Sequence, residues 1–186
     1  MDGGLEYTRE FIPALVDAFA QMFFFPRSLV AACNGHAIAG GAAMLCTADV
    51  RYGVRGKGLI GVPELLVGVP FPLIAMQIMK FAVRPDQFQE VIYSGHNYDI
   101  ESSLKLGLCE KDFEADQLIE RACARVQGLA EISRESFRLS KAAMRVGVKN
   151  LLSQYGQAMD AEVAGFWCSD EIIVRIEKYL DKTLRA

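Results

Sequence analysis

The stretch NGHAIAGGAAMLCTADV, residues 34–50, places three glycines and no obvious catalytic side chain between two apolar segments. The preceding run, residues 28–33, predicts a short buried strand, and residues 49–54 predict a second one. Between them, the small apolar residues 39–47 are typical of a buried helix. This order of strand, glycine turn, helix and strand predicts an α/β fold around a largely parallel sheet that is buried on both faces.

Helices are predicted on both sides of this unit. Residues 7–24 carry apolar side chains at helical spacing, and the helix is expected to stop before Pro26. The glycines and prolines of residues 53–72 predict a connecting segment. Asp99 and Ser133 are predicted helix N-caps, and Gly107 a helix end. Further helices are expected at 73–81, 86–93, 100–106, 115–129, 133–146, 151–164 and 169–184. We therefore expect an α/β core at 1–113 and a helical region at 114–186.

Composition limits the classes of function. The 186 residues are 52% hydrophobic and carry a net charge of -3, with acidic and basic residues distributed along the chain. Nucleic acid is therefore an unexpected partner, because no basic stripe is present. The apolar runs are too short for a membrane span, and no secretory leader is expected. Five cysteines without a CxxC pair and only two histidines predict a cytoplasmic protein without a metal site.

Three kinds of site place glycines before a helix. The phosphate loop is excluded because Gly41 and Ala42 stand where lysine and a hydroxyl residue are needed, and the dinucleotide fingerprint lacks its glycine spacing. A backbone oxyanion site at the start of the helix remains possible, since it requires only N–H groups. Taken alone, the glycines are more commonly explained by close packing of the helix against a strand.

Glu64 is the candidate acid or base. It lies in the apolar run LIGVPELLV, residues 59–67, where burial would raise the pKa of its carboxyl group toward a value useful for proton transfer. The alternative is an exposed residue in the first turn of a helix, where a carboxylate complements the helix dipole. Together with an oxyanion site, Glu64 would indicate proton transfer next to a polarised carbonyl.

Three motifs in the same order resemble the crotonase superfamily, the enoyl-CoA hydratase/isomerase group. They are NGHAIAGGAAMLCTADVRYG at 34–53, IGVPELLVGVP at 60–70 and YSGHNYDIESSLKLGL at 93–108. The resemblance implies a spiral of ββα units, N-terminally incomplete here, with C-terminal helices that build a homotrimer or a dimer of trimers. It also implies an acyl-CoA substrate and no separate cofactor, because coenzyme A is part of the substrate.

The resemblance further assigns roles to single residues. The Gly40 N–H would polarise the thioester carbonyl and Glu64 would carry the substrate proton, with Ala39, Gly41 and Pro63 contacting the substrate. Hydratases of the family carry a second glutamate where this chain has Ala43. One carboxylate suffices to move a proton between two carbons, whereas hydration benefits from two. Isomerisation of Δ3- to Δ2-enoyl-CoA is therefore favoured, and hydration is the alternative.

Other features carry weaker expectations. Relative to the family, the chain begins after the first oxyanion loop, so one N–H donor is expected to be missing, and a non-catalytic chain that assembles with intact subunits is a further alternative. His36 could make a loop hydrogen bond or contact substrate, and His96 is expected in a turn. Three basic residues near the C-terminus could meet coenzyme A phosphates from a neighbouring subunit or simply face solvent: Lys178, Lys182 and Arg185.

Overall fold

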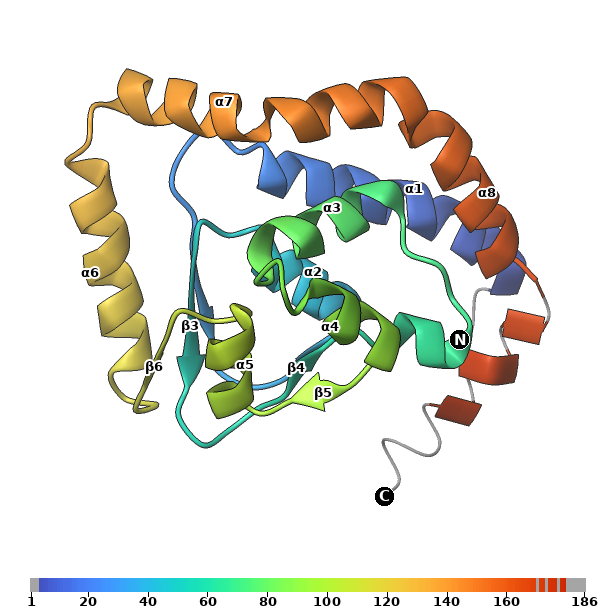
Figure 1. Ribbon diagram of the computed structural model, residues 1–186, viewed down its shortest axis with the longest axis horizontal. Helices are drawn as coiled ribbons and strands as arrows, with labels where there is room; N and C mark the ends of the chain where they lie inside the picture. The colour runs from blue at the N-terminus through green and yellow to red at the C-terminus, as the bar shows by residue number, and fades with distance from the viewer. Residues whose placement is uncertain (1–3, 170, 173, 177, 180–186) are drawn as a thin grey trace.

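The computed structural model describes residues 4–169, 171, 172, 174–176, 178 and 179 (Figure 1). The elements named in this structure are, in chain order, α1 (Gly4–Phe23), β1 (Val30–Cys33), β2 (Ala37–Ile38), α2 (Gly40–Cys46), β3 (Val50–Val54), β4 (Ile60–Gly61), η1 (Pro63–Val67), α3 (Leu73–Ala82), α4 (Phe88–Ser94), β5 (Asn97–Tyr98), α5 (Ile100–Leu106), β6 (Lys111–Phe113), α6 (Leu118–Ala130), α7 (Arg134–Leu151), η2 (Leu152–Gly156) and α8 (Gln157–Trp167).

A parallel three-stranded sheet, ordered β1-β3-β6, contains both predicted strands. Val30 pairs with Val50 along the first ladder, and Tyr52 pairs with Lys111 along the second. The predicted strands at 28–33 and 49–54 are thus confirmed within two residues of their ends. The sequence analysis missed β6, because its three residues, of which two are charged, carry neither an apolar run nor an alternation.

A second sheet, ordered β2-β4-β5, corrects the prediction of a glycine turn and a connecting segment. In it β2 runs parallel to β4, and β5 runs antiparallel to β4. Each of its strands has two residues, which is too short for any hydrophobic period to be recognised in the sequence. His96, predicted to lie in a turn, directly precedes β5.

The parallel sheet is buried on both faces, as predicted. On one face the main core joins α1, α2 and α3 through large side chains such as Phe19, Phe23 and Ile78. On the other, Tyr52 packs with Leu118 of α6. Figure 1 shows α1 and α7 lying together along one side of the molecule, while α6 stands beside β3 and β6. One side of α2, with Ala42, Ala43, Leu45 and Cys46, is buried in the core, whereas Met44 is exposed.

The predicted helices are found with their ends within three residues, with one main exception. Residues 133–146 and 151–164 were expected as two helices, but the π-helical turn η2 joins α7 to α8 without a break. Asp99 and Ser133 are N-caps, accepting hydrogen bonds from the backbone N–H groups of Ser102 and Ser136, and Gly107 ends α5 with a φ of 87°. Of the helix predicted at 169–184, residues 171, 172, 174–176, 178 and 179 are helical, and its remainder beyond Ser169 lies outside the described residues.

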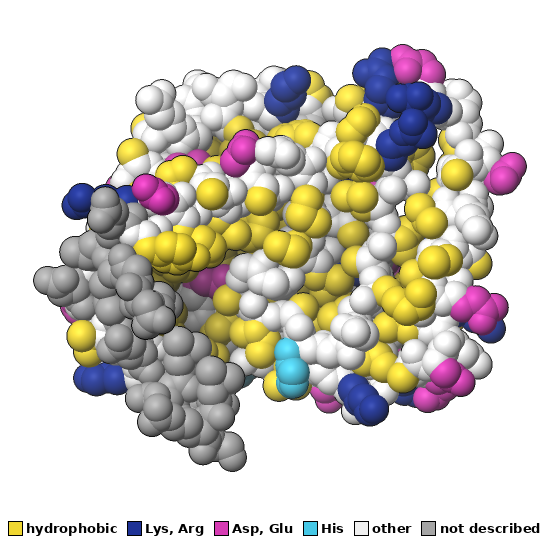
Figure 2. Space-filling model, turned by 180° about the vertical axis from the view of Figure 1, so that it is seen from behind, with side chains coloured by type: hydrophobic (Ala, Val, Ile, Leu, Met, Phe, Trp, Pro, Cys, Tyr) yellow, Lys and Arg dark blue, Asp and Glu magenta, His cyan; other side chains and the backbone are white. Residues whose placement is uncertain are grey.

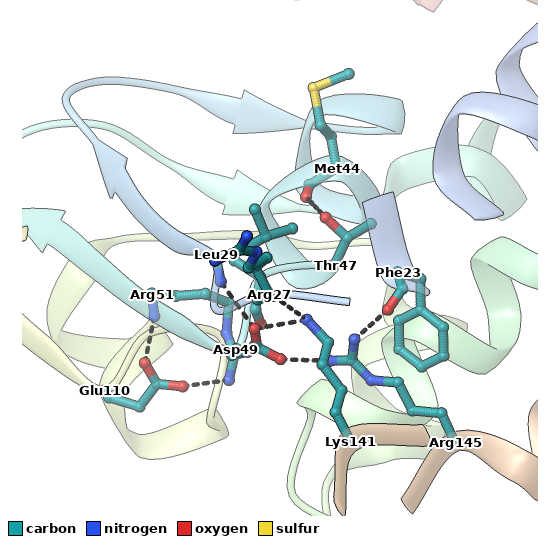
Figure 3. A network of polar contacts seen from close by, with 11 residues as sticks. Phe23, Arg27, Leu29, Met44, Thr47, Asp49, Arg51, Glu110, Lys141 and Arg145 are labelled. Atoms are coloured by element: carbon teal, nitrogen blue, oxygen red, sulfur yellow. Dashed lines mark hydrogen bonds and ion pairs between the residues drawn. The ribbon is translucent and has the colours of Figure 1, made fainter. Parts of the chain in front are cut away.

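A buried ionic cluster holds α7 on the α/β core (Figure 3). The Asp49 carboxylate accepts hydrogen bonds from Lys141 Nζ at 2.7 Å, Arg145 Nη2 at 2.9 Å and the Leu29 backbone N–H at 2.8 Å. Both cationic side chains are 3% exposed. Arg145 also donates to the carbonyl oxygen of Phe23 and lies 4.2 Å from the centre of its ring. Because Asp49 follows α2 by three residues, this cluster also anchors the C-terminal end of α2.

Candidate functional site

Strand pairing brings Gly40 and Glu64 to one edge of the second sheet. Ala37 of β2 pairs with Ile60 of β4, and Ile38 pairs with Gly61. Gly40 follows the end of β2 by two residues, and Glu64 follows the end of β4 by three. Since β2 and β4 are parallel, their carboxyl ends share an edge, and side chains that follow them meet there. Two motifs that are 24 positions apart in sequence thus become neighbours.

The Gly40 N–H points away from α2. The preceding carbonyl, that of Ala39, accepts hydrogen bonds from Ala42 N at 2.9 Å and Ala43 N at 3.2 Å. In a planar trans peptide the carbonyl oxygen and the following N–H point in opposite directions. The first N–H groups of a helix also have no acceptor within the helix and carry partial positive charge. Such a group can stabilise negative charge that develops on a carbonyl oxygen.

The two glycines at the start of α2 are not explained by close packing. A Cβ atom on Gly41 would meet nothing within 4 Å, and one on Gly40 would lie 3.7 Å from Phe19 Cζ, an ordinary contact. The expectation that these glycines only allow a helix to cross a strand tightly is therefore wrong for both positions. Gly40 is partly buried and Gly41 is exposed, so a ligand can approach the start of α2.

The Glu64 carboxylate is buried in an apolar environment, as the sequence predicts. Glu64 is the second residue of η1 and is 8% exposed, two residues after Val62, which is 0% exposed. Its Oε2 atom has no hydrogen-bond partner in the described part of the chain. Burial raises the pKa of Glu64 from 4.5 to about 7, against a smaller lowering effect of its own backbone N–H. A carboxyl group with this pKa can both accept and donate a proton near neutral pH.

Two glycines outside the predicted site position the Glu64 segment. A Cβ atom on Gly95, which has a φ of 60°, would lie 2.6 Å from Leu66 Cγ and 3.4 Å from Pro63 Cα. A Cβ atom on Gly61 would collide with the carbonyl oxygen of His96. These contacts hold η1 between β4 and the loop after α4. Both glycines lie in the motifs at 60–70 and 93–108 that resemble the family, but the sequence analysis expected only a connecting segment at 53–72 and a turn at His96.

The candidate site contains one buried acidic side chain. Glu64 is the only buried Asp or Glu in the described part of the chain, and Ala43, where the family resemblance led us to look for a second glutamate, is 1% exposed within the main core. His36 and His96 are both exposed, and the ring of His96 lies edge-on to Tyr98 at 6.1 Å. Among the C-terminal basic residues Lys178 is exposed, whereas Lys182 and Arg185 lie outside the described residues.

The surface beside η1 is apolar. Leu65 and Leu66 are 40% and 57% exposed, and Tyr93 on α4 is 68% exposed. Figure 2 shows a face of the molecule on which many hydrophobic side chains are exposed. Glu64 itself is recessed, at 8% exposed. An apolar surface next to a recessed acid fits a substrate with a hydrocarbon chain.

The chain is similar to proteins that process enoyl-CoA. Residues 3–182 match the family model described as enoyl-CoA hydratase/isomerase. "Probable enoyl-CoA hydratase EchA17" of Mycobacterium tuberculosis is 32% identical over 110 residues, covering 59% of this chain and 40% of that protein. Mitochondrial enoyl-CoA delta isomerase 1 of Rattus norvegicus is 24% identical over 174 residues, covering 93% of this chain and 60% of that protein. The chain thus spans about half the length of these relatives.

Solved structures confirm the predicted fold. An enoyl-CoA hydratase from Mycobacterium avium superposes with a TM-score of 0.80 at 19% identity, covering 98% of this chain and 71% of that one. An enoyl-CoA hydratase/isomerase family protein from Pseudomonas syringae gives a TM-score of 0.76 at 24% identity, covering 86% of this chain and 71% of that one. The chain therefore shares the fold of these proteins over most of its length.

Proposed function

Because the chain belongs to the enoyl-CoA hydratase/isomerase family, we propose that it converts Δ3- to Δ2-enoyl-CoA, with Glu64 carrying the proton between the two carbons. One observation carries this proposal: a single buried carboxylate, with an unpartnered oxygen and a pKa of about 7, lies at the strand edge that also bears the Gly40 N–H. The substrate class is an acyl-CoA thioester, and coenzyme A enters as part of the substrate.

The reaction needs two groups of this chain. The Gly40 N–H donates a hydrogen bond to the thioester carbonyl oxygen and stabilises it as negative charge develops there. The ionised Glu64 removes a proton from C2, the C2–C3 bond gains double-bond character and the C3–C4 double bond is lost. Glu64 then returns the same proton to C4, so the enzyme ends in its starting state. No water enters, and no other reactant is consumed.

Isomerisation is favoured over hydration by the number of carboxylates. Adding water across the Δ2 double bond benefits from one acid that orients and deprotonates water and another that handles the C2 proton. This chain supplies Glu64 but has Ala43 at the position of the second acid. The similarity to the rat delta isomerase supports the same choice.

Hydration is the second candidate, because EchA17 and other relatives carry the name enoyl-CoA hydratase. The two activities are separated by supplying a 2-enoyl-CoA and measuring 3-hydroxyacyl-CoA by liquid chromatography. Ready formation of the hydroxy product overturns the use of Ala43 as evidence for isomerisation. No hydroxy product, together with turnover of 3-enoyl-CoA, supports isomerisation.

The role of Glu64 is tested by turnover of 3-enoyl-CoA with the unsubstituted chain, Glu64→Gln and Glu90→Gln. Glu90 is an exposed glutamate on α4 and serves as the matched control. Removing a positioned acid or base is expected to lower kcat by about 10²–10⁴-fold, so Glu64→Gln should be nearly inactive and Glu90→Gln fully active. Normal turnover by Glu64→Gln overturns the proposal. A folded but inactive unsubstituted chain instead supports the non-catalytic alternative.

We also propose a homotrimer or a dimer of trimers, located in the cytoplasm. Exposed apolar side chains on α7, η2 and α8 support an assembly surface: Leu139, Met144, Val146, Tyr155, Met159 and Phe166. All five cysteines are free, as a reducing compartment requires. No helix among the described residues is long and apolar enough to span a membrane. Light scattering coupled to gel filtration tests the assembly, and a monomeric mass at micromolar concentration contradicts it.

A further inference from the structure

The backbone of Ala39 is strained. Its φ of 55° and ψ of -127° make it the only non-glycine residue with a positive φ in the described part of the chain. These angles are those of the first central residue of a type II′ turn, a position that normally requires glycine because a Cβ atom is crowded there. Strain of this kind persists only where the surrounding structure enforces it, and it is concentrated at functional sites.

Two different elements enforce the conformation. The Ala39 N–H donates to the carbonyl oxygen of Gly61 at 2.8 Å and so extends the pairing of β2 with β4. The Ala39 carbonyl accepts from Ala42 and Ala43 in the first turn of α2. The peptide planes on either side of Ala39 are therefore held by β4 and by α2. Only φ and ψ of Ala39 can adjust between them.

We propose that Ala39 is a positioning residue that fixes the direction of the Gly40 N–H, an inference that rests on the proposed function. The N–H lies in the same rigid peptide plane as the Ala39 carbonyl, so it cannot turn unless both hydrogen bonds to α2 break. Glycine at position 39 would reach the same angles without strain, but it would also reach many others. The hydrogen bonds on either side hold Ala39 at its strained angles. The alanine methyl group excludes most of the other angles that glycine could reach, and so narrows the directions that the Gly40 N–H can take.

The test compares Ala39→Gly with Ala42→Gly. Ala42 lies within α2, is 0% exposed, and has a φ outside the left-handed region, so its backbone is not strained. Glycine at this position removes the contacts of a buried methyl group and lowers helix propensity, but it relieves no strain. Relief of strain in Ala39→Gly is expected to raise the thermal midpoint by about 2–6 °C, while Ala42→Gly lowers it by a similar amount. The thermal midpoint can be measured whether or not the protein is enzymatically active.

The positioning role is measured with 3-enoyl-CoA. Ala39→Gly is expected to lower kcat by roughly 10–100-fold while KM changes by less than about 3-fold, because the donor is misaligned for the transition state and substrate contacts are kept. An unchanged kcat, or a midpoint that falls as in Ala42→Gly, overturns the inference. If the proposed function itself is wrong, the unsubstituted chain does not convert 3-enoyl-CoA. That result overturns the positioning role as well.

Discussion

The backbone N–H of Ala39 donates a hydrogen bond of 2.8 Å to the carbonyl oxygen of Gly61. This bond joins the glycine turn directly to the segment that carries Glu64. It lies at the end of the two-residue ladder between β2 and β4. Short as this ladder is, it determines that the backbone donor and the buried carboxylate share one strand edge.

The buried Glu64 is expected to make stability depend on pH. Its pKa of about 7 in the folded protein exceeds the ordinary value of 4.5, so between these values the folded state holds a proton that the unfolded state has released. Stability therefore falls as pH rises from about 4.5 to 7, by at most about 3 kcal/mol in total. Glu64→Gln should remove this loss and be more stable than the unsubstituted chain at pH 8.

Urea unfolding of both proteins at pH 5 and pH 8 measures the effect. Glu90→Gln is the control, and its free energy of unfolding should follow that of the unsubstituted chain at both pH values. Equal pH dependence in Glu64→Gln and the unsubstituted chain would contradict the raised pKa.

How much the sequence predicts depends on the length of each element. The strands β1 and β3 and the long helices contain enough residues to show an apolar run or a helical period. By contrast, β2, β4 and β5 have two residues each and are defined by their partners, which are distant in sequence. A local pattern cannot identify such strands, so a second sheet appeared to be a turn and a connecting segment.

In the candidate site, too, local features could be predicted from the sequence, whereas features that depend on distant residues could not. Burial of Glu64 could be predicted, because its sequence neighbours are apolar. Its place beside Gly40 depends on the pairing of β2 with β4, and only the resemblance to a family suggested it. The close approaches at Gly61 and Gly95 could not be predicted either, because nothing in a sequence distinguishes a glycine needed for packing from one in a loose loop.

The Asp49 cluster is expected to be a major contribution to stability. Asp49→Asn leaves Lys141 and Arg145, both 3% exposed, without their shared negative charge. Removing one partner of a buried ion pair costs about 3–5 kcal/mol, because a buried charge remains uncompensated. Urea unfolding should show this loss. Glu101→Gln, in an exposed pair with Lys105, is the control and should change stability by less than about 1 kcal/mol. Similar small losses in both variants would contradict the role of the cluster.

The cysteines are expected to differ strongly in reactivity. Burial raises the pKa of Cys46 to about 11 and that of Cys109 to about 12, so both remain protonated thiols at neutral pH. Cys123 on α6 is exposed. Brief treatment with iodoacetamide followed by peptide mass spectrometry should show labelling of Cys123 and almost none of Cys46 or Cys109. In urea all three should be labelled. Labelling of Cys46 in the native protein as fast as that of Cys123 would show that the core around α2 opens readily.

Gly95 is expected to affect both stability and catalysis. Alanine at this position would adopt a φ of 60° and place its Cβ atom 2.6 Å from Leu66 Cγ, so the Leu66 side chain or the η1 segment must move. We expect a loss of about 1–3 kcal/mol in the free energy of unfolding. Because η1 carries Glu64, kcat for 3-enoyl-CoA should fall by at least about tenfold.

Gly128→Ala is the matched control, since Gly128 lies within α6 and a Cβ atom there would meet nothing within 4 Å. It should stabilise the protein by about 0.4–1 kcal/mol and leave kcat unchanged. If Gly95→Ala keeps full stability and turnover, the loop after α4 does not hold Glu64 in place.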